Sequence, residues 1–123
     1  IDMEIRADEQ RARSRSALPR FVAAVVAQAG LRGMYSHKFS LRNFGQTATN
    51  VRIQYSGGGA PNSISFEHFN QERDYSEVLE YATDYEFKME ISFEDASGEP
   101  GVTYIDFKVT KHRLHIGRPE TVQ

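Results

Sequence analysis

The sequence lacks cysteine and tryptophan altogether among its 123 residues. Without cysteine the chain has no disulfide framework, no cysteine-ligated metal site and no cysteine nucleophile. This cysteine usage is compatible with the cytoplasm. The sequence also lacks an excess of one charge, because its formal net charge is only −2. No overall field therefore recruits nucleic acid or anionic lipid.

A long apolar run is missing as well. The apolar segment Phe21–Ala29 is far shorter than the roughly 20 residues that cross a bilayer. It resembles the core of a secretory signal, but it follows a leader that contains four acidic residues, and we reject that interpretation. Because both of its faces are apolar, we expect a first strand, buried in the core or against a neighbour. The alternative is a short helix, since alanine is common here.

The first residues form a charged leader. Its second half turns basic, with Arg11, Arg13 and Arg15 before Pro19, which disfavours helix at the residue before it. We predict either a solvated helical or disordered leader, or the flank of a membrane helix, where arginines gather on the cytoplasmic side. The chain starts at Ile1, and we expect a fragment or a processed product. We divide it into a leader or linker (1–19), a β-domain (20–117) and a polar tail (118–123).

The pattern is clearest in Lys38–Tyr55, which holds two runs of alternating polar and apolar residues. A period of two is typical of half-buried strands. Between the runs, Asn43 can bond nearby backbone and Gly45 can adopt positive φ, which favours a chain reversal. The sequence therefore predicts strand, corner, strand, with both apolar faces in one core.

Further strands follow the same rule. We expect a short edge strand at Ser63–Phe69, a polar connection at 70–76, and either a strand or one helical turn at 78–81. Tyr85–Glu94 and Val102–Val109 alternate strongly and predict a hairpin. Thr110–Ile116 would prolong its second strand. Six or seven strands without a convincing second helix indicate an all-β fold, either an antiparallel sandwich or a small closed β-barrel.

The run Leu41–Ile53 resembles immunoglobulin-like domains of bacterial envelope and membrane-anchored proteins. Those domains carry a recurring Asn-x-Gly…Ala-x-Asn-Val-x-Ile between their second and third strands, and Tyr85–Val109 looks like their closing hairpin. The resemblance covers about residues 34–110. It implies an immunoglobulin-like sandwich of about seven strands, often beside a membrane helix, that acts as a binding or spacing module. It brings no catalytic residues.

Arg42 and Arg52 are the candidate ligand- or partner-binding residues. If the central strands form a hairpin, the two arginines oppose each other, and an acidic partner or anionic ligand would relieve their repulsion. If the strands lie in different sheets, the two are unrelated surface residues. We expect no metal site, because His112 and His115 on one strand would point to opposite faces. No nucleophile-elbow motif is present.

We therefore expect a non-enzymatic binding or interaction domain without cofactors, the soluble and cytoplasmic portion of a bacterial membrane-anchored protein. Its partner would be another protein or a second copy, and a segment before Ile1 would reach the membrane. One alternative is a ligand-sensing β-barrel of a membrane effector that binds an anionic signalling nucleotide. Another is an enzyme of unknown class. Acids are as dense as bases, so we expect no nucleic-acid polymer as partner.

Overall fold

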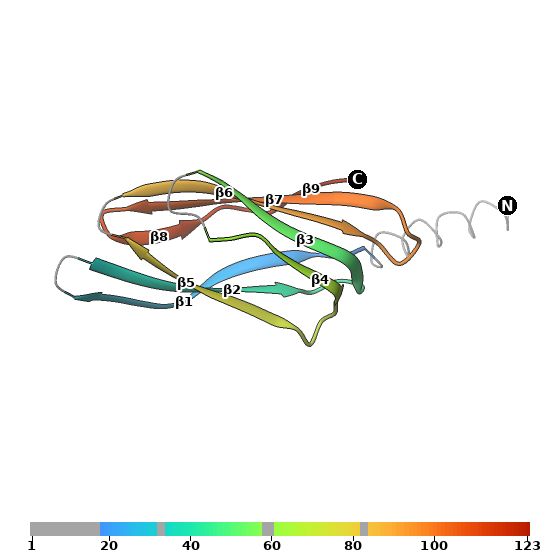
Figure 1. Ribbon diagram of the computed structural model, residues 1–123, viewed down its shortest axis with the longest axis horizontal. Helices are drawn as coiled ribbons and strands as arrows, with labels where there is room; N and C mark the ends of the chain where they lie inside the picture. The colour runs from blue at the N-terminus through green and yellow to red at the C-terminus, as the bar shows by residue number, and fades with distance from the viewer. Residues whose placement is uncertain (1–17, 32–33, 58–60, 82–83) are drawn as a thin grey trace, which may run out of the picture.

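The computed structural model describes residues 18–31, 34–57, 61–81 and 84–123, which form two antiparallel sheets packed face to face (Figure 1). The smaller sheet has the order β1 (Phe21–Leu31), β2 (Met34–Asn43), β5 (Asp74–Tyr81). The larger has the order β4 (Ile64–Phe69), β3 (Ala48–Gly57), β6 (Tyr85–Glu94), β7 (Pro100–Thr110), β8 (Arg113–Ile116), and β9 (Glu120–Val122) also pairs with β7. The described strands do not close into a barrel, so the sandwich prediction is confirmed.

Almost all of the predicted leader lies outside the described residues. Among the residues that the structure does describe, no helix is long and apolar enough to cross a membrane.

The core lies between the two sheets, where the alternating residues point inward. Phe39 and Leu41 of β2 are fully buried, as the alternation predicts, and so are Ile105 and Phe107 of β7. The rings of Phe39 and Phe107 meet edge to face across the sandwich, with centroids 4.9 Å apart. Full burial of one such side chain contributes roughly 1.5–3 kcal/mol, so these strands hold the two sheets together.

The corner between β2 and β3 is organised by the buried side chain of Asn43. Its oxygen accepts hydrogen bonds from the backbone N–H groups of Arg20 and Gly45, both at 2.9 Å. Its nitrogen donates to the backbone carbonyls of Gln46 and Phe69, both at 2.8 Å. Both polar atoms of the amide make two hydrogen bonds. This one side chain therefore ties the corner to the start of β1 and the end of β4.

Gly45 has a different role from the one expected, because it is not among the residues with positive φ. A Cβ atom at this position would lie 1.9 Å from the carbonyl oxygen of Leu18. Phe44 donates a backbone hydrogen bond to Arg20 at 2.8 Å, and Gln46 donates one to Leu18 at 3.2 Å. The segment before β1 therefore crosses the corner closely, and that approach requires glycine.

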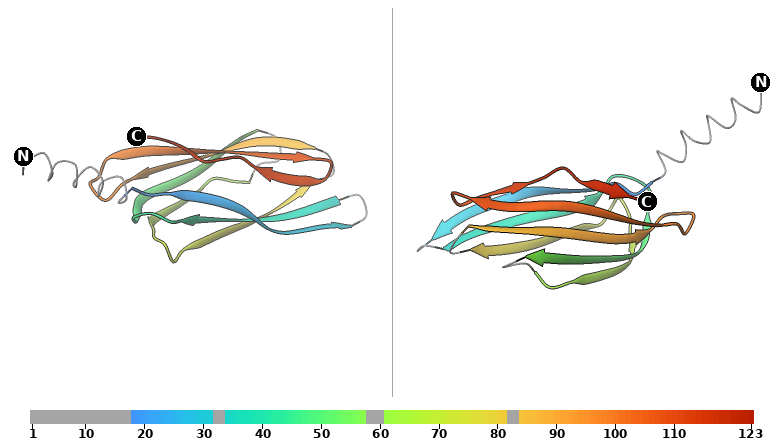
Figure 2. Two further views of the ribbon diagram at one scale, coloured as in Figure 1. Left: turned by 180° about the vertical axis from the view of Figure 1, so that it is seen from behind. Right: turned by 90° about the horizontal axis from the view of Figure 1, so that it is seen from above.

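The sandwich has two distinct ends. At the leader end lie the β2–β3 corner, the β6–β7 turn and the C-terminus (Figures 1 and 2). Leu18 accepts a backbone hydrogen bond from Gln46 in that corner. The side chain of Gln123 donates to the Asp95 carboxylate in the β6–β7 turn at 2.6 Å. At the far end lie the β7–β8 turn, the end of β1 and the start of β2 (Figure 1). The C-terminus is thus remote from the far end (Figures 1 and 2).

Two expectations about the later strands are wrong. The strand that ends at Thr110 is not prolonged, because Lys111 and His112 form a two-residue turn and β8 doubles back on β7. The polar connection ends earlier than expected, because β5 already begins at Asp74. Residues 118–123, expected to be a polar tail, are exposed and include β9, which pairs with β7. The open choice at 78–81 resolves to a strand.

The first segment is a strand, as expected, but it is not buried in the core along its whole length. Phe21 is buried in the core, but the second half of β1 is exposed, and 57% of the surface of Val26 is accessible. A β-bulge between Val25 and Ala27 interrupts the register with β2. The apolar residues on both faces of β1 therefore do not reflect burial on both faces within this chain.

Candidate functional site

Arg42 and Arg52 do not form one site. Arg42 belongs to β2 in the smaller sheet and Arg52 to β3 in the larger, and each points to the outer face of its own sheet. The guanidinium of Arg42 lies 5.5 Å from the ring centroid of Phe44 and donates to the carbonyl of Gln71 at 3.4 Å. The backbone carbonyl of Arg52 accepts from the Ser92 hydroxyl at 3.4 Å. The opposed pair therefore does not exist, and each arginine remains a separate candidate.

His112 and His115 do not lie on one continuous strand, as was assumed when they were predicted to point to opposite faces. His112 lies in the β7–β8 turn, and His115 lies on β8 opposite Lys108. The described part of the chain contains no group of three or more histidine or acidic residues that could hold a metal ion.

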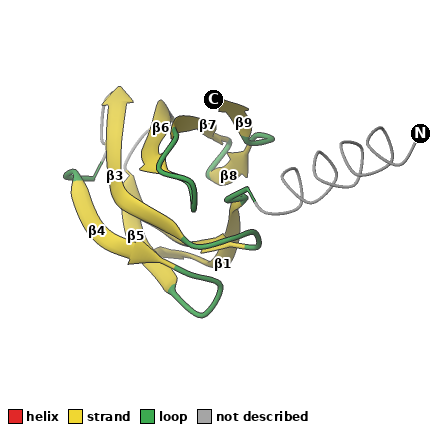
Figure 3. Cartoon of the chain, turned by 90° about the vertical axis from the view of Figure 1, so that its right-hand side faces the viewer, coloured by secondary structure: helices red, strands yellow, loops and turns green. Residues whose placement is uncertain are grey.

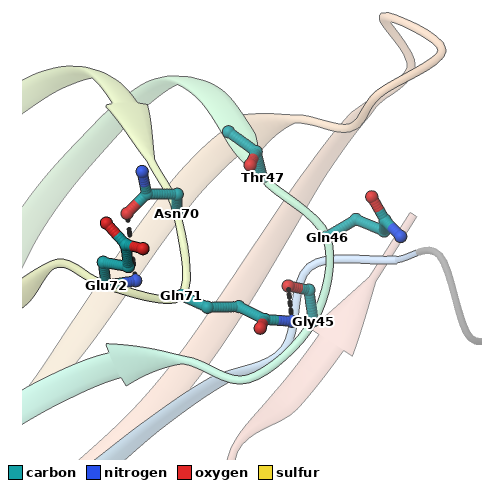
Figure 4. A pocket seen from close by; sticks show the side chains of 6 residues that line it. All are labelled: Gly45, Gln46, Thr47, Asn70, Gln71 and Glu72. Carbon is teal, nitrogen blue, oxygen red and sulfur yellow. Dashed lines mark hydrogen bonds between the residues drawn. The ribbon is translucent and has the colours of Figure 1, made fainter.

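One hollow, at the leader end, lies between the β2–β3 corner and the β4–β5 turn (Figure 4). The side chain of Gln71 bridges the two segments by donating to the Gly45 carbonyl at 3.0 Å. The Asn70 side chain accepts from the backbone of Glu72 at 3.0 Å, which closes the turn. Glu72 is the one titratable side chain in the lining. These contacts pack two turns together, and we assign this hollow a structural role.

A second hollow, at the far end, is basic and has a volume of about 400 Å³. We call it the basic hollow; its lining is Gln28, Ala29, Gly30, Tyr35, His37, Lys111, His112 and Arg113. Two permanent cations and two histidines line it, without an acidic side chain. Three other hollows of similar size each include at least one glutamate. The basic hollow is therefore distinguished by its charge.

The β7–β8 turn that forms one wall of the basic hollow is strained. Lys111 has φ 51° and His112 has φ 68°, in the left-handed region. A two-residue hairpin turn of this kind prefers Asn-Gly, and each larger side chain costs roughly 1–2 kcal/mol there. Such strain persists where the surroundings hold the residues in place, and it gathers at functional sites.

Two contacts from β2 hold this turn. The rings of Tyr35 and His112 stack, with centroids 3.8 Å apart and an interplanar angle of 12°. His37, which is 1% exposed, has its Nε2 atom 2.9 Å from the carbonyl oxygen of His112. Since a carbonyl only accepts, Nε2 carries the proton in this hydrogen bond. The turn is therefore fixed to the opposite sheet.

A third candidate is the edge of the smaller sheet formed by β1, which we call the β1 edge. Its exposed residues are Ala24, Val26, Ala27, Gln28, Ala29 and Gly30. Among the described strands β1 forms a ladder with β2 alone, and it lies beside β8 at the margin of the sandwich (Figure 3). No residue of β1 is charged. By contrast, the edge strand β5 contains three acids and β4 contains Glu67.

Buried titratable groups occur in other parts of the sandwich. Burial raises the pKa of Tyr55 to about 12, and burial also raises the pKa of Tyr75, whose hydroxyl donates to Glu77 at 2.8 Å. The hydroxyl of Ser97 donates to Asp95 at 2.6 Å and is the main cause of a lowered pKa of that carboxyl. None of these groups lines the basic hollow.

Comparison with known proteins gives no match to a family model, a curated protein or a solved structure. The fold and the surfaces described above are therefore the basis for a functional proposal.

Proposed function

We propose that this chain is a non-enzymatic interaction module with an immunoglobulin-like fold, and that it associates with a second copy of itself through the β1 edge. The strand order supports the fold assignment. The first, second and fifth strands form one sheet, and the third, fourth, sixth and seventh strands belong to the other. Immunoglobulin-like sandwiches divide their strands between two antiparallel sheets in a related way.

The observation that carries the proposal is the uncharged, exposed β1 edge. Natural proteins protect free strand edges with charges, prolines or very short strands, because unpaired backbone groups attract other strands. β1 has eleven residues, none charged and none proline. The bulge at Val26 is its one protective feature. An edge of this composition favours a partner strand.

A second copy fits this edge by composition. In a two-fold pair the same segment faces itself, so a strand that contains several like charges brings them close to their copies, which destabilises the pair. β5 could not pair with itself without bringing Asp74, Glu77 and Glu80 close to their copies. β1 brings alanine, valine and glutamine together instead. Antiparallel pairing would bury part of Val26 and would join the two small sheets into one.

We further propose that the module is the cytoplasmic, soluble portion of a bacterial membrane-anchored protein, attached through a segment before Ile1. The resemblance of Leu41–Ile53 and the arginines of residues 11–20 support this. The coding sequence upstream of Ile1 should then contain an apolar span of about 20 residues. A full gene without such an apolar span would contradict the proposed membrane anchor.

The two alternatives fare differently. The sensor alternative assumed a closed barrel, and the two open sheets overturn that architecture. Binding of an anionic ligand does not require a barrel and is considered below. The enzyme alternative receives little support, because no acidic side chain is among the described residues that line the basic hollow.

Cysteine crosslinking tests the self-association. The natural chain has no cysteine, so a single introduced thiol can only bridge to another copy. In a two-fold antiparallel pair one residue faces itself, at a Cα separation of about 4.5–5.5 Å that a disulfide can span. Single cysteines at the six exposed positions of β1 should therefore give rapid disulfide dimers at one position and its neighbours.

The matched control is Val78→Cys on β5, since Val78 and Val26 are similarly exposed, at 54% and 57%. Val78→Cys should crosslink slowly under the same oxidation conditions. Equal rates at Val78 and at every β1 position, together with a monomeric natural chain by light scattering, would overturn the proposed β1 pairing.

A further inference from the structure

The geometry points to the basic hollow as a binding site for a small phosphate-bearing ligand that also carries an aromatic ring. This inference goes beyond the proposed self-association and does not rest on it. It follows from the charge, the rigidity and the aromatic surface of the hollow, which are properties of residues 35–37 and 111–113.

The charge of the hollow favours an anion. Lys111 in the turn and Arg113 directly after it are exposed, and neither has an acidic partner in the part of the chain that the structure describes. The one ion pair found there joins Lys88 to Asp106 on other strands. Phosphate accepts charge-assisted hydrogen bonds from both side-chain types, and arginine can bind it through two parallel bonds.

The rigidity of the wall favours a specific site over a diffuse basic surface. The positive φ angles of Lys111 and His112 are maintained by the stack on Tyr35 and by the hydrogen bond from His37. The turn therefore holds its backbone in one position before any ligand arrives. Preorganised groups lose less freedom on binding, and strained residues that the fold keeps in place are a reason to suspect function.

The aromatic surface explains why we expect a ring in the ligand. Tyr35 covers one face of the His112 ring, while His112 itself is exposed. A planar group can therefore extend the stack on the outer face of His112, beside the cations of Lys111 and Arg113. Nucleic-acid bases stack on protein aromatic rings in this manner. The volume of about 400 Å³ lies within the usual range for small-molecule sites.

Binding can be measured by titrating the whole 123-residue chain with inorganic pyrophosphate and with ADP, following backbone amide resonances by NMR. We expect the largest shifts at residues 28–30, 35–37 and 111–113. The variant Lys111→Gln/Arg113→Gln should bind both probes about tenfold more weakly or worse, because two charge-assisted contacts are lost. The control variant Arg73→Gln/Arg118→Gln removes two exposed cations that do not line the hollow and should bind normally.

ADP should bind more tightly than pyrophosphate, and His112→Ala should reduce that difference. Equal affinities for the two probes would overturn the ring-binding part. Shifts spread over all basic side chains, or equal losses in the test and control variants, would overturn the site itself. The variant Val26→Lys, designed to prevent β1 pairing, should bind both probes normally, so failure of the dimer and failure of this site give different results.

Discussion

At the scale of single residues, Gly45 gives the sharpest prediction. Gly45→Ala would place a methyl group 1.9 Å from the carbonyl oxygen of Leu18, so the segment before β1 has to move off the corner. We expect a loss of at least about 2 kcal/mol in the free energy of unfolding, measured by urea denaturation.

The control is Gly117→Ala, where a Cβ atom would find its nearest neighbours at 3.5 Å. It should change stability by no more than about 0.5 kcal/mol. Equal effects at the two glycines would show that the close crossing at the corner does not limit stability.

The hydrogen bonds of Asp95 predict how the stability of the protein depends on pH. The hydrogen bond from the Ser97 hydroxyl, helped by the backbone of Glu99 and the side chain of Gln123, holds the pKa of Asp95 below its usual value of 3.8. A carboxyl with a lowered pKa in the folded state stabilises above its unfolded pKa, and this contribution is lost as pH falls through the folded pKa. Natural protein and Asp95→Asn should therefore differ in stability at neutral pH and converge below about pH 4.

Urea unfolding of both proteins across this pH range measures the difference. A gap that stays constant down to the most acidic pH would show that the carboxylate charge is not what stabilises the β6–β7 turn.

Residue roles were only partly predictable from the sequence. That Asn43 would bond nearby backbone followed from its side chain and from the chain reversal around it. Its bonds to Arg20 and Phe69 could not be predicted, because they depend on how distant strands meet. Gly45 was recognised as necessary, but for backbone conformation. The actual reason is a crossing segment, which no local pattern reveals.

At the scale of elements, the strain in the β7–β8 turn predicts a trade-off between the stability of the fold and ligand binding at the basic hollow. Replacing Lys111→Asn and His112→Gly installs the preferred pair for a two-residue turn and removes two left-handed residues with large side chains. The relief of backbone strain, roughly 1–2 kcal/mol per residue, should exceed the stabilisation lost with the Tyr35–His112 stack, about 0.5–1.5 kcal/mol. The variant should be more stable by about 1 kcal/mol and should lose pyrophosphate binding.

Thermal and urea unfolding measure the first effect and the NMR titration measures the second. A variant that is less stable than the natural protein would show that the stack with Tyr35 outweighs the backbone strain.

Strands were predictable where side chains alternate in size and polarity, as in Tyr85–Glu94, because one face of such a strand must be buried. The turn at Lys111 was missed since it has neither glycine nor asparagine, the usual signals of a tight hairpin. β9 was missed because its residues are all exposed, so its sequence does not show the alternation that a half-buried strand requires. For β1, apolar residues predicted burial, whereas they are alanines and valines at an open edge.

At the scale of the whole molecule, the residues that line the basic hollow lie together at the far end of the sandwich. The basic hollow combines the end of β1, the start of β2 and the β7–β8 turn, and His37 and His112 lie 75 positions apart in the chain. The basic residues at 111–113 were visible in the sequence, but Tyr35 and Gln28 join them only once two sheets pack. For the same reason Arg42 and Arg52, close in sequence, are separated by the sandwich.

The arrangement of the ends also relates the two proposed surfaces. β1 runs from the leader end to the far end, so its exposed half adjoins the basic hollow through residues 28–30.

The most direct test of the central claim, that two copies pair through β1, is amide hydrogen exchange at low and high protein concentration. Backbone N–H groups that gain a strand partner become protected from exchange. We predict that protection within residues 24–30 rises with concentration, while the free edges formed by β4 and β5 exchange at unchanged rates. Exchange in β1 that is independent of concentration, in a protein that stays monomeric throughout, would contradict the account.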